Sequence, residues 1–237
     1  MTTMTTHSTH STHSTHSTHS THSRPLDIGW MLRTVEKHLG KDAKAMVERV
    51  SRNPFDVLVS TLLSLRTKDE TTEPAAKRLL GVAPDPETML ALSATTIAKL
   101  IYPVGFYRRK AEQLRGVSKL LLDRHHGAVP AEMEALLELP GVGRKTANLV
   151  LSAGFGIPAI CVDTHVHRIT NRWGYVRTRT PEETETALRA KLPGRHWLTI
   201  NGLLVLFGKA VCQPISPHCS TCPVGARCPR VGVGRHR

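Results

Sequence analysis

The sequence is poor in aromatic residues and has no long apolar run. Phe, Trp and Tyr make up 4% of the 237 residues, which argues against a β-sandwich and against a sheet that stacks bases on aromatic rings. The longest nearly apolar stretch, Leu149–Val162, is interrupted by Gly154, Gly156 and Pro158 and is too short to span a bilayer. There is no apolar signal core near the N-terminus. We therefore expect no membrane association and a cytoplasmic location.

Acidic residues are also scarce relative to basic ones. The chain carries 32 Lys and Arg against 19 Asp and Glu, which gives a formal net charge of +13. Such an excess suggests an acidic partner, with nucleic acid as the first candidate, although charge alone is weak support.

A low-complexity segment opens the chain. Residues 6–23 are six copies of Thr-His-Ser. The segment has no apolar face that could offset the entropy of ordering it, so we predict a disordered tail over residues 1–23. Its histidines leave open loose binding of a transition metal.

The remainder reads as helical throughout. Apolar residues recur at three- and four-residue steps, which predicts helices over Arg108–His125, Pro130–Leu139, Arg144–Ala153 and Trp197–Phe207. Thr180 precedes Pro and two Glu, which is typical of a helix start. No segment alternates like a strand between hairpin turns, so the predicted fold class is all-α.

The turn within Leu139–Ala147 is the first specific signal. Gly141 and Gly143 permit a tight turn and a close backbone approach to a ligand. The helix that follows begins with unpaired N–H groups, which can bind a DNA phosphate. A plain connection between two helices remains the alternative.

The helix after this turn and the segment beyond it each contain a candidate catalytic residue. Lys145 lies in the first helical turn, where the macrodipole and the adjacent Arg144 disfavour an ammonium, so a neutral amine could attack a sugar carbon. Asp163 lies 18 residues further on and could stabilise developing positive charge. The alternatives are a solvated or phosphate-binding lysine and an aspartate that only caps a helix.

Four of the five cysteines are crowded near the end of the chain. Cys212, Cys219, Cys222 and Cys228 have the spacing C-x6-C-x2-C-x5-C, whereas Cys161 lies in an apolar run and is expected to be buried. This crowding does not resemble a disulfide framework. Four thiolates can hold either zinc or an iron–sulfur cluster, and the spacing alone does not decide between them.

The stretch Leu-Pro-Gly-Val-Gly-Arg-Lys-Thr-Ala at residues 139–147 resembles the helix-hairpin-helix of the endonuclease III family of DNA glycosylases. Further landmarks of that family follow in order from Val57 to Cys228. The resemblance implies that Lys145 is a Schiff-base nucleophile, that Asp163 is its acidic partner and that His165 lies near the active site. It also implies DNA contacts by Gly141, Gly143 and Arg144, and a [4Fe–4S] cluster on the four cysteines.

The same resemblance implies a reaction. A lysine that displaces a damaged base and then drives β-elimination makes the enzyme a glycosylase and an abasic-site lyase, whereas relatives with Tyr or Ser at that position cut strands poorly. We expect excision of oxidised pyrimidines, of the thymine glycol type, from double-stranded DNA that contains damaged bases or abasic sites. The base must leave the stack, which costs a few kcal/mol. The alternatives are a monofunctional mismatch glycosylase and a non-catalytic DNA-binding module.

The sequence departs from the family pattern at three places. Arg66 stands where the best-known members have Gln, and Phe106 would be a larger wedge than the usual Leu. A surface arginine and a core aromatic at a helix start are the alternatives. Arg108, Arg109 and Lys110 follow and suit phosphate contacts. The loop between the first two cysteines, residues 213–218, has no Lys or Arg, so its DNA contact is expected to be weaker.

Together these patterns predict two lobes. A six-helix lobe spans residues 47–157, and an iron–sulfur lobe combines residues 24–46 and 158–237. Lys145 and Asp163 would face each other across the cleft between them. We expect the enzyme to act as a monomer, near the nucleoid if the source is bacterial.

Overall fold

The computed structural model describes residue 1 and residues 26–40, 42–51 and 53–237. The predicted tail, apart from residue 1, lies outside the described residues. Within them the chain is helical and contains no strand, which confirms the predicted all-α class. The α-helices are α1 (Ile28–Leu39), α2 (Met46–Val50), α3 (Pro54–Ser64), α4 (Asp69–Val82), α5 (Pro86–Ala91), α6 (Ala94–Ile101), α7 (Tyr107–His125), α8 (Met133–Leu137), α9 (Arg144–Leu149), α10 (Thr164–Arg172), α11 (Pro181–Lys191) and α12 (Ile200–Ala210).

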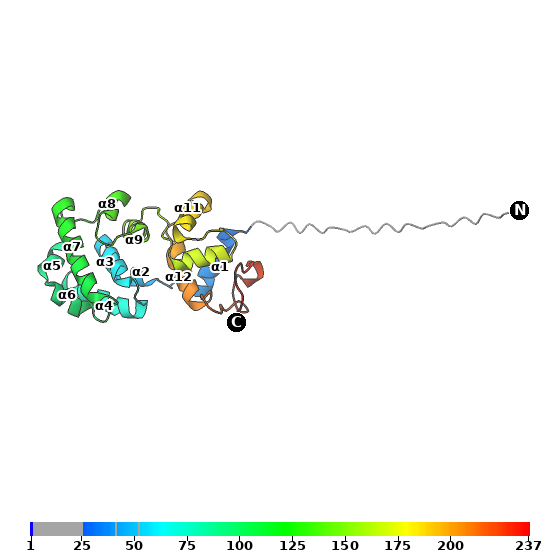
Figure 1. Cartoon of the computed structure of the whole chain (residues 1–237), viewed down its shortest axis with the longest axis horizontal. Coiled ribbons are helices and arrows are strands. Elements are labelled where there is room, and N and C mark those ends of the chain that lie inside the picture. The colour runs from blue at the N-terminus through cyan, green and yellow to red at the C-terminus, as the bar shows by residue number, and fades with distance from the viewer. Residues whose placement is uncertain (2–25, 41, 52) are drawn as a thin grey trace.

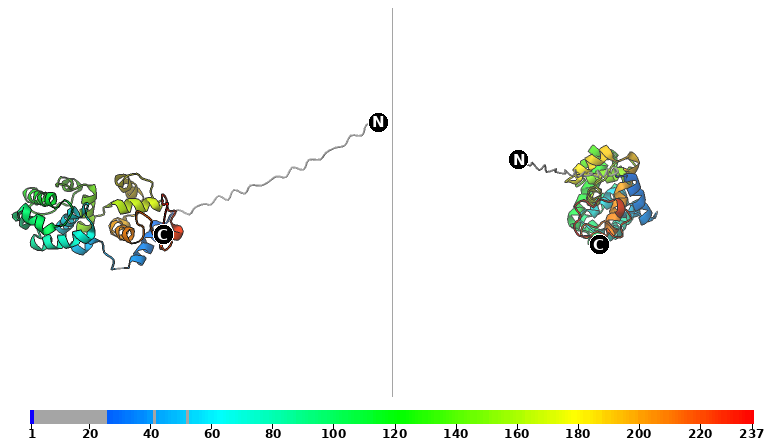
Figure 2. Two further views of the ribbon diagram at one scale, coloured as in Figure 1. Left: turned by 60° about the horizontal axis from the view of Figure 1, so that its bottom comes forward. Right: turned by 90° about the vertical axis from the view of Figure 1, so that its right-hand side faces the viewer.

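Two apolar cores organise these helices, and the ribbon views show the helices as two bodies side by side (Figure 1 and Figure 2). The first core lies among α2–α9 and uses residues from Met46 to Ala159; we call this body the hairpin lobe. The second core joins α1 to residues Ile160–Val224, including α10, α11 and α12; we call it the cysteine lobe. The N-terminal α1 packs against α12, so segments far apart in the sequence close this lobe. None of the described helices is long and apolar enough to cross a membrane.

Helix starts follow local capping chemistry. Asn53 accepts a hydrogen bond of 2.9 Å from the backbone N–H of Asp56, with Pro54 in the first turn of α3. Thr180 caps α11 in the same way, by accepting from the N–H of Glu183. Because these side chains satisfy N–H groups that a helix start leaves unpaired, they fix where each helix begins. The helix predicted over residues 108–125 is present as α7.

Two predicted helix starts were wrong. The helix expected from Pro130 begins at Met133, because the backbone of Glu132 is still extended (φ −110°, ψ 139°). The helix expected from Trp197 begins at Ile200. Trp197 instead follows a short 3₁₀ turn, Gly194–His196, and its indole N–H donates to the carbonyl of Leu192.

The helix predicted over residues 144–153 changes its winding partway. α9 ends at Leu149 and continues as the π-helical turn Val150–Gly154, called η1. There the chain presses on α3, since a Cβ added at Gly154 would lie 3.1 Å from the Cα of Pro54. π-turns inside helices are frequent at functional sites. This π-helical turn directly follows α9, and the first turn of α9 contains Lys145.

Candidate functional site

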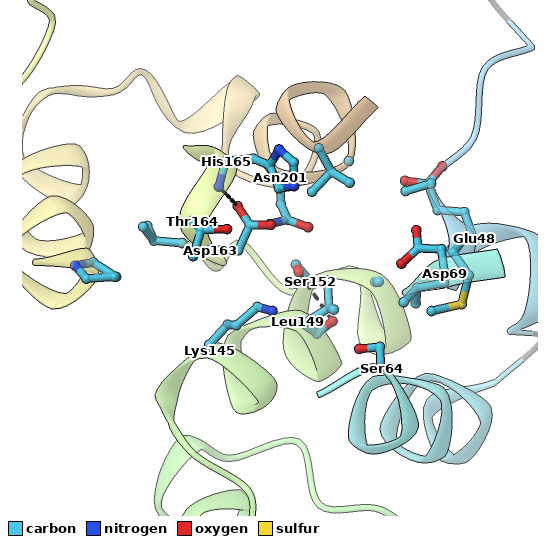
Figure 3. Close-up of a pocket in the computed structure, with 18 of the residues that line it drawn as sticks. Glu48, Ser64, Asp69, Lys145, Leu149, Ser152, Asp163, Thr164, His165 and Asn201 are labelled. Carbon is cyan, nitrogen blue, oxygen red and sulfur yellow. Dashed lines mark hydrogen bonds between the residues drawn. The ribbon is translucent and has the colours of Figure 1, made fainter. Parts of the chain in front are cut away.

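A cleft of about 430 Å³ lies between the two lobes. Figure 3 shows side chains from both lobes around it. The hairpin lobe contributes residues of α2, the end of α3, the start of α4 and α9, and the cysteine lobe contributes the start of α10 and part of α12. Three predicted site residues line this cleft, namely Lys145, Asp163 and His165. The lining also includes Asn201, and among the described residues it contains no Phe, Tyr or Trp.

The amine of Lys145 is free. Lys145 is exposed in the first turn of α9, and Figure 3 shows its side chain extended into the cleft on the side where the Asp163 carboxylate lies. Among the described residues its Nζ has no hydrogen-bond or ion-pair partner. Lys209, the other lysine on the cleft wall, is instead paired with Asp69 across the two lobes. A lysine that is not held in an ion pair can move its amine to a substrate carbon.

Asp163 both caps a helix and faces the cleft. Its Oδ1 accepts hydrogen bonds of 2.9 and 2.8 Å from the N–H groups of His165 and Val166, at the start of α10. Oδ2 makes no hydrogen bond within the described part of the chain. The structural and functional readings of this aspartate are therefore compatible. One oxygen is fixed by the helix, and the carboxylate charge stays available to the cleft.

His165 is held beside this carboxylate. It is half-buried, and its Nδ1 lies 3.1 Å from Nη2 of Arg168. Burial lowers the pKa of His165, against the raising effect of the nearby Asp163 charge. A neutral imidazole at this position can accept or donate a hydrogen bond without adding positive charge to the cleft.

The hairpin turn has the geometry of an anion site. Gly141 has a φ of 74°, and a Cβ there would lie 1.8 Å from Nε2 of Gln113, which donates to the carbonyl of Pro140. Both the conformation and the close approach require glycine. Gly143 is exposed, and α9 starts without a side-chain cap. Its first N–H groups are thus available to an anion.

Arg144, which the sequence predicts to contact DNA, forms an ion pair with Glu185 in this structure. Its Nη2 donates 2.6 Å to Oε1 of Glu185 on α11, and Arg189 donates to the same oxygen at 2.9 Å. Burial alone would raise the pKa of Glu185, but hydrogen bonds from these two arginines lower it. The group joins the two lobes behind Lys145. Sequence reasoning missed Glu185, because nothing local marks it as the buried member of an interlobe ion pair.

Arg66 and Phe106 lie outside the cleft, on two adjacent turns of the hairpin lobe. Phe106 is 61% exposed, which excludes a core aromatic. Arg66 is also exposed, and its Cζ lies 5.9 Å from the centre of the Phe106 ring. Lys110, expected beside them as a surface cation, is 5% exposed, so that prediction was wrong. The reason is helical periodicity, because Lys110 shares the inner face of α7 with Leu114 and Val117.

The four clustered cysteines line one small apolar pocket with Trp173 and Phe207. In the described part of the chain, no group of three or more His, Cys, Asp or Glu side chains is arranged to hold a metal ion. Nη1 of Arg172 lies 3.5 Å from Sγ of Cys212. Burial raises the pKa of Cys222 to about 11 and also raises that of Cys228. These thiols become ligands only when a cationic centre favours their ionised form.

Cys161 is separate from this set. It is 1% exposed in the cysteine lobe, as predicted, and burial raises its pKa to about 12.

The loop at residues 213–218 is fixed from outside the pocket. Arg237 donates to the carbonyl of Ser216 and to Oε1 of Gln213, which brings a guanidinium to a loop that lacks Lys and Arg.

Known proteins with this sequence pattern and shape are DNA repair enzymes. Residues 59–193 match the HhH-GPD superfamily of base excision DNA repair proteins. Endonuclease III of Thermotoga maritima is 49% identical over 191 residues, which cover 78% of this chain and 90% of that protein. A trapped endonuclease III–DNA covalent intermediate, an estranged-adenine complex, has a TM-score of 0.78 at 35% identity, covering 86% of this chain and 94% of that one. A thermostable thymine-DNA glycosylase has a TM-score of 0.74 at 25% identity, covering 85% and 95%.

Proposed function

The chain belongs to the endonuclease III family of base-excision repair enzymes, which are DNA glycosylases with abasic-site lyase activity, and we propose that both of its bond-breaking steps run through Lys145. The observation that carries this proposal is the free amine of Lys145 in the interlobe cleft, on the side of the Asp163 carboxylate. Lys209, the other candidate nucleophile on the cleft wall, is held in an ion pair with Asp69.

The first step exchanges one bond at the sugar for another. Nζ of Lys145 attacks C1′ of an extruded nucleotide, the C1′–N bond breaks, and the base leaves with the bonding electron pair and takes up a proton. The Asp163 carboxylate stabilises the positive charge that develops at C1′ and accepts the proton that the attacking amine loses. Opening of the sugar ring then leaves a protonated imine between Lys145 and C1′.

The second step breaks the strand. The imine acidifies the C2′ proton, and its removal drives expulsion of the 3′ phosphate by β-elimination. We assign that proton to Asp163 or His165, which line the same cleft beside each other. Phosphates of the damaged strand bind at the start of α9, to the N–H groups that follow Gly141 and Gly143. Arg144 adds its charge there while it remains paired with Glu185.

The cleft suits an oxidised pyrimidine of the thymine glycol type. Its volume of about 430 Å³ is enough for a single base, and its walls offer hydrogen-bonding groups such as Asn201 and Ser64. A saturated, hydroxylated ring is not planar and gains little from aromatic stacking, which agrees with a lining without Phe, Tyr or Trp.

A monomeric state and a nucleoid location stay predictions, which gel filtration and imaging of a tagged chain would check.

Arg66 and Phe106 are proposed to enter the duplex from the hairpin lobe. Their exposure and their position on neighbouring turns support this role. Phe106 would occupy the stack beside the extruded nucleotide, and Arg66 would offer hydrogen-bond donors to the base left opposite.

The four cysteines are proposed to hold a [4Fe–4S] cluster. The donor set fits, since four thiol sulfur atoms line one apolar pocket. Four thiolates can hold either an iron–sulfur cluster or zinc, and membership of the endonuclease III family favours the cluster. When bound, the cluster would cross-link the loops between Cys212 and Cys228, and no reaction step passes through it. An absorbance band at roughly 400 nm would support the cluster, and a colourless zinc protein would contradict it.

One assay on purified protein separates the alternatives. Duplexes containing thymine glycol, a T·G mismatch or an abasic site are incubated with the enzyme, and the products are run with and without alkali. Cleavage of the thymine glycol strand without alkali supports the proposal. Cleavage of the mismatch strand only after alkali would indicate a monofunctional mismatch glycosylase. Binding without any cleavage would indicate a non-catalytic module.

A further inference from the structure

Lys110 is a buried cation held by uncharged oxygen atoms. Its Nζ donates hydrogen bonds of 2.7 Å to the carbonyl oxygens of both Leu63 and Leu65, and it lies 3.3 Å from Oγ1 of Thr67. No carboxylate pairs with it among the residues that the structure describes. Burial lowers its pKa to about 8, so the side chain is still mostly an ammonium at neutral pH, with its donors in use. Burying such a charge works against stability unless hydrogen bonds offset it.

The hydrogen bonds of Lys110 join two separate segments. Leu63 and Leu65 lie on either side of the end of α3, where helix carbonyls lack intrahelical partners, and Arg66 follows directly. The backbone N–H of Lys110 donates to the carbonyl of Phe106 at 3.0 Å. One residue therefore fixes the turn that carries Arg66 and the turn that carries Phe106.

These two turns are also in direct contact. The N–H of Gly105 donates to Oγ1 of Thr67 at 3.1 Å, and a Cβ at Gly105 would lie 3.0 Å from the carbonyl oxygen of Arg66. Arg66 and Phe106 both have left-handed backbones, with φ of 56° and 57°. Non-glycine residues adopt this conformation uncommonly, and it persists where the surroundings impose it.

We propose that Lys110 is a positioning residue that joins Arg66 and Phe106 into one rigid probe, which enters the duplex as a unit at the place of the extruded nucleotide. The inference rests on the proposed insertion of these two side chains into DNA. A probe that is already ordered loses less conformational entropy on binding than two independent turns. The aromatic ring and the guanidinium 5.9 Å from its centre then reach the gap together.

A double-mutant cycle measures whether the two side chains act as a unit. Single-turnover excision is measured on a thymine glycol duplex for Arg66→Ala, Phe106→Ala and the double variant, with Lys110 intact and with Lys110→Met. With Lys110 intact we expect each single change to slow excision about tenfold and the double change to slow it little further. Lys110→Met should itself slow excision about tenfold and remove this non-additivity. Its unfolding midpoint should stay close to that of the wild type.

Further variants make the outcome decisive even if Lys110→Met does not fold. Thr67→Val removes the hydroxyl shared by Gly105 and Lys110 and should weaken the coupling, whereas Thr67→Ser should restore it. Lys119→Met alters an exposed lysine of the same helix and should change nothing. If the effects of Arg66→Ala and Phe106→Ala multiply whether or not Lys110 and Thr67 are intact, the two side chains act independently. That result would overturn the rigid probe but not the insertion of the two side chains. If both single variants excise at the wild-type rate, the insertion of Arg66 and Phe106 is wrong and the probe falls with it, while the chemistry assigned to Lys145 stands.

Discussion

The two lobes hold their functional side chains differently. On the hairpin lobe, Lys145 and Phe106 are exposed, and Lys145 makes no side-chain bond within the described residues. On the cysteine lobe, Asp163 is half-buried and caps α10, and Cys222 and Cys228 sit in a shared pocket. One lobe therefore supplies exposed groups that reach toward DNA, and the other supplies groups that also hold the fold together. Changes to Lys145 or Phe106 should affect activity alone, whereas changes to Asp163 or to the clustered cysteines should affect stability as well.

The largest expected effect on activity comes from Lys145→Gln. Because the side chain has no described partner, its loss should leave the unfolding midpoint unchanged, while strand cleavage at an abasic site should fall by at least about 10³-fold. Gel assays and thermal melts of the same preparation check both parts. Lys209→Gln is the matched control on the opposite wall. A variant of Lys145 that melts early, or still cuts, would break the comparison.

In the cysteine lobe, Cys222→Ser should remove a ligand of the proposed cluster. We expect loss of the band at roughly 400 nm and a fall in the unfolding midpoint on the order of 10 °C. Cys161→Ala changes a buried cysteine outside the pocket and should keep the band. Absorbance spectra and melts of the three proteins provide the measurement. A coloured and equally stable Cys222→Ser would show that the pocket does not depend on this thiol.

Asp163 separates the two kinds of effect within one residue. Asp163→Ala should destabilise the protein by about 1 kcal/mol, since two N–H groups of α10 lose their acceptor, and should also abolish efficient base excision. Asp163→Asn keeps a capping oxygen but not the charge, so it should be nearly as stable as wild type and still inactive. Denaturant titration and excision rates measure this pair. Full activity in Asp163→Asn would mean that the carboxylate serves only as a cap.

The smallest effect is expected from Arg237→Gln. Its guanidinium lies beside the loop at residues 213–218, which has no basic residue of its own. We expect binding to undamaged duplex to weaken about threefold and its salt dependence to fall by at most one released ion. Fluorescence anisotropy at several salt concentrations gives both values. An unchanged salt slope would remove Arg237 from the DNA-facing surface.

Short-range chemistry made part of this molecule predictable. The turn at Leu139–Ala147 and the caps at Asn53 and Thr180 depend on residues within a few positions of each other, so the hairpin and several helix starts could be predicted from sequence. The placement of Lys145 and Asp163 at one cleft came from the family resemblance. Cys161 was predicted as buried from the apolar run around it.

Long-range contacts account for what was missed. Lys110 looked like the third cation of a surface run, and its partners Leu63 and Leu65 lie far away in the sequence. The periodicity of α7 nevertheless placed it on the inner face with Leu114. Glu185 gave no comparable signal, because the two arginines that hold it come from both lobes. A helical pattern can place such a charge on an inner face, but the partners that hold it depend on tertiary packing.

The central claim is that Lys145 forms the covalent bond to deoxyribose. The enzyme is incubated with an abasic duplex in the presence of borohydride, the reduced adduct is digested, and the modified peptide is identified by mass spectrometry. We predict the sugar on Lys145 and no covalent adduct with Lys145→Gln. A sugar on Lys209 or on the N-terminal amine would contradict the account.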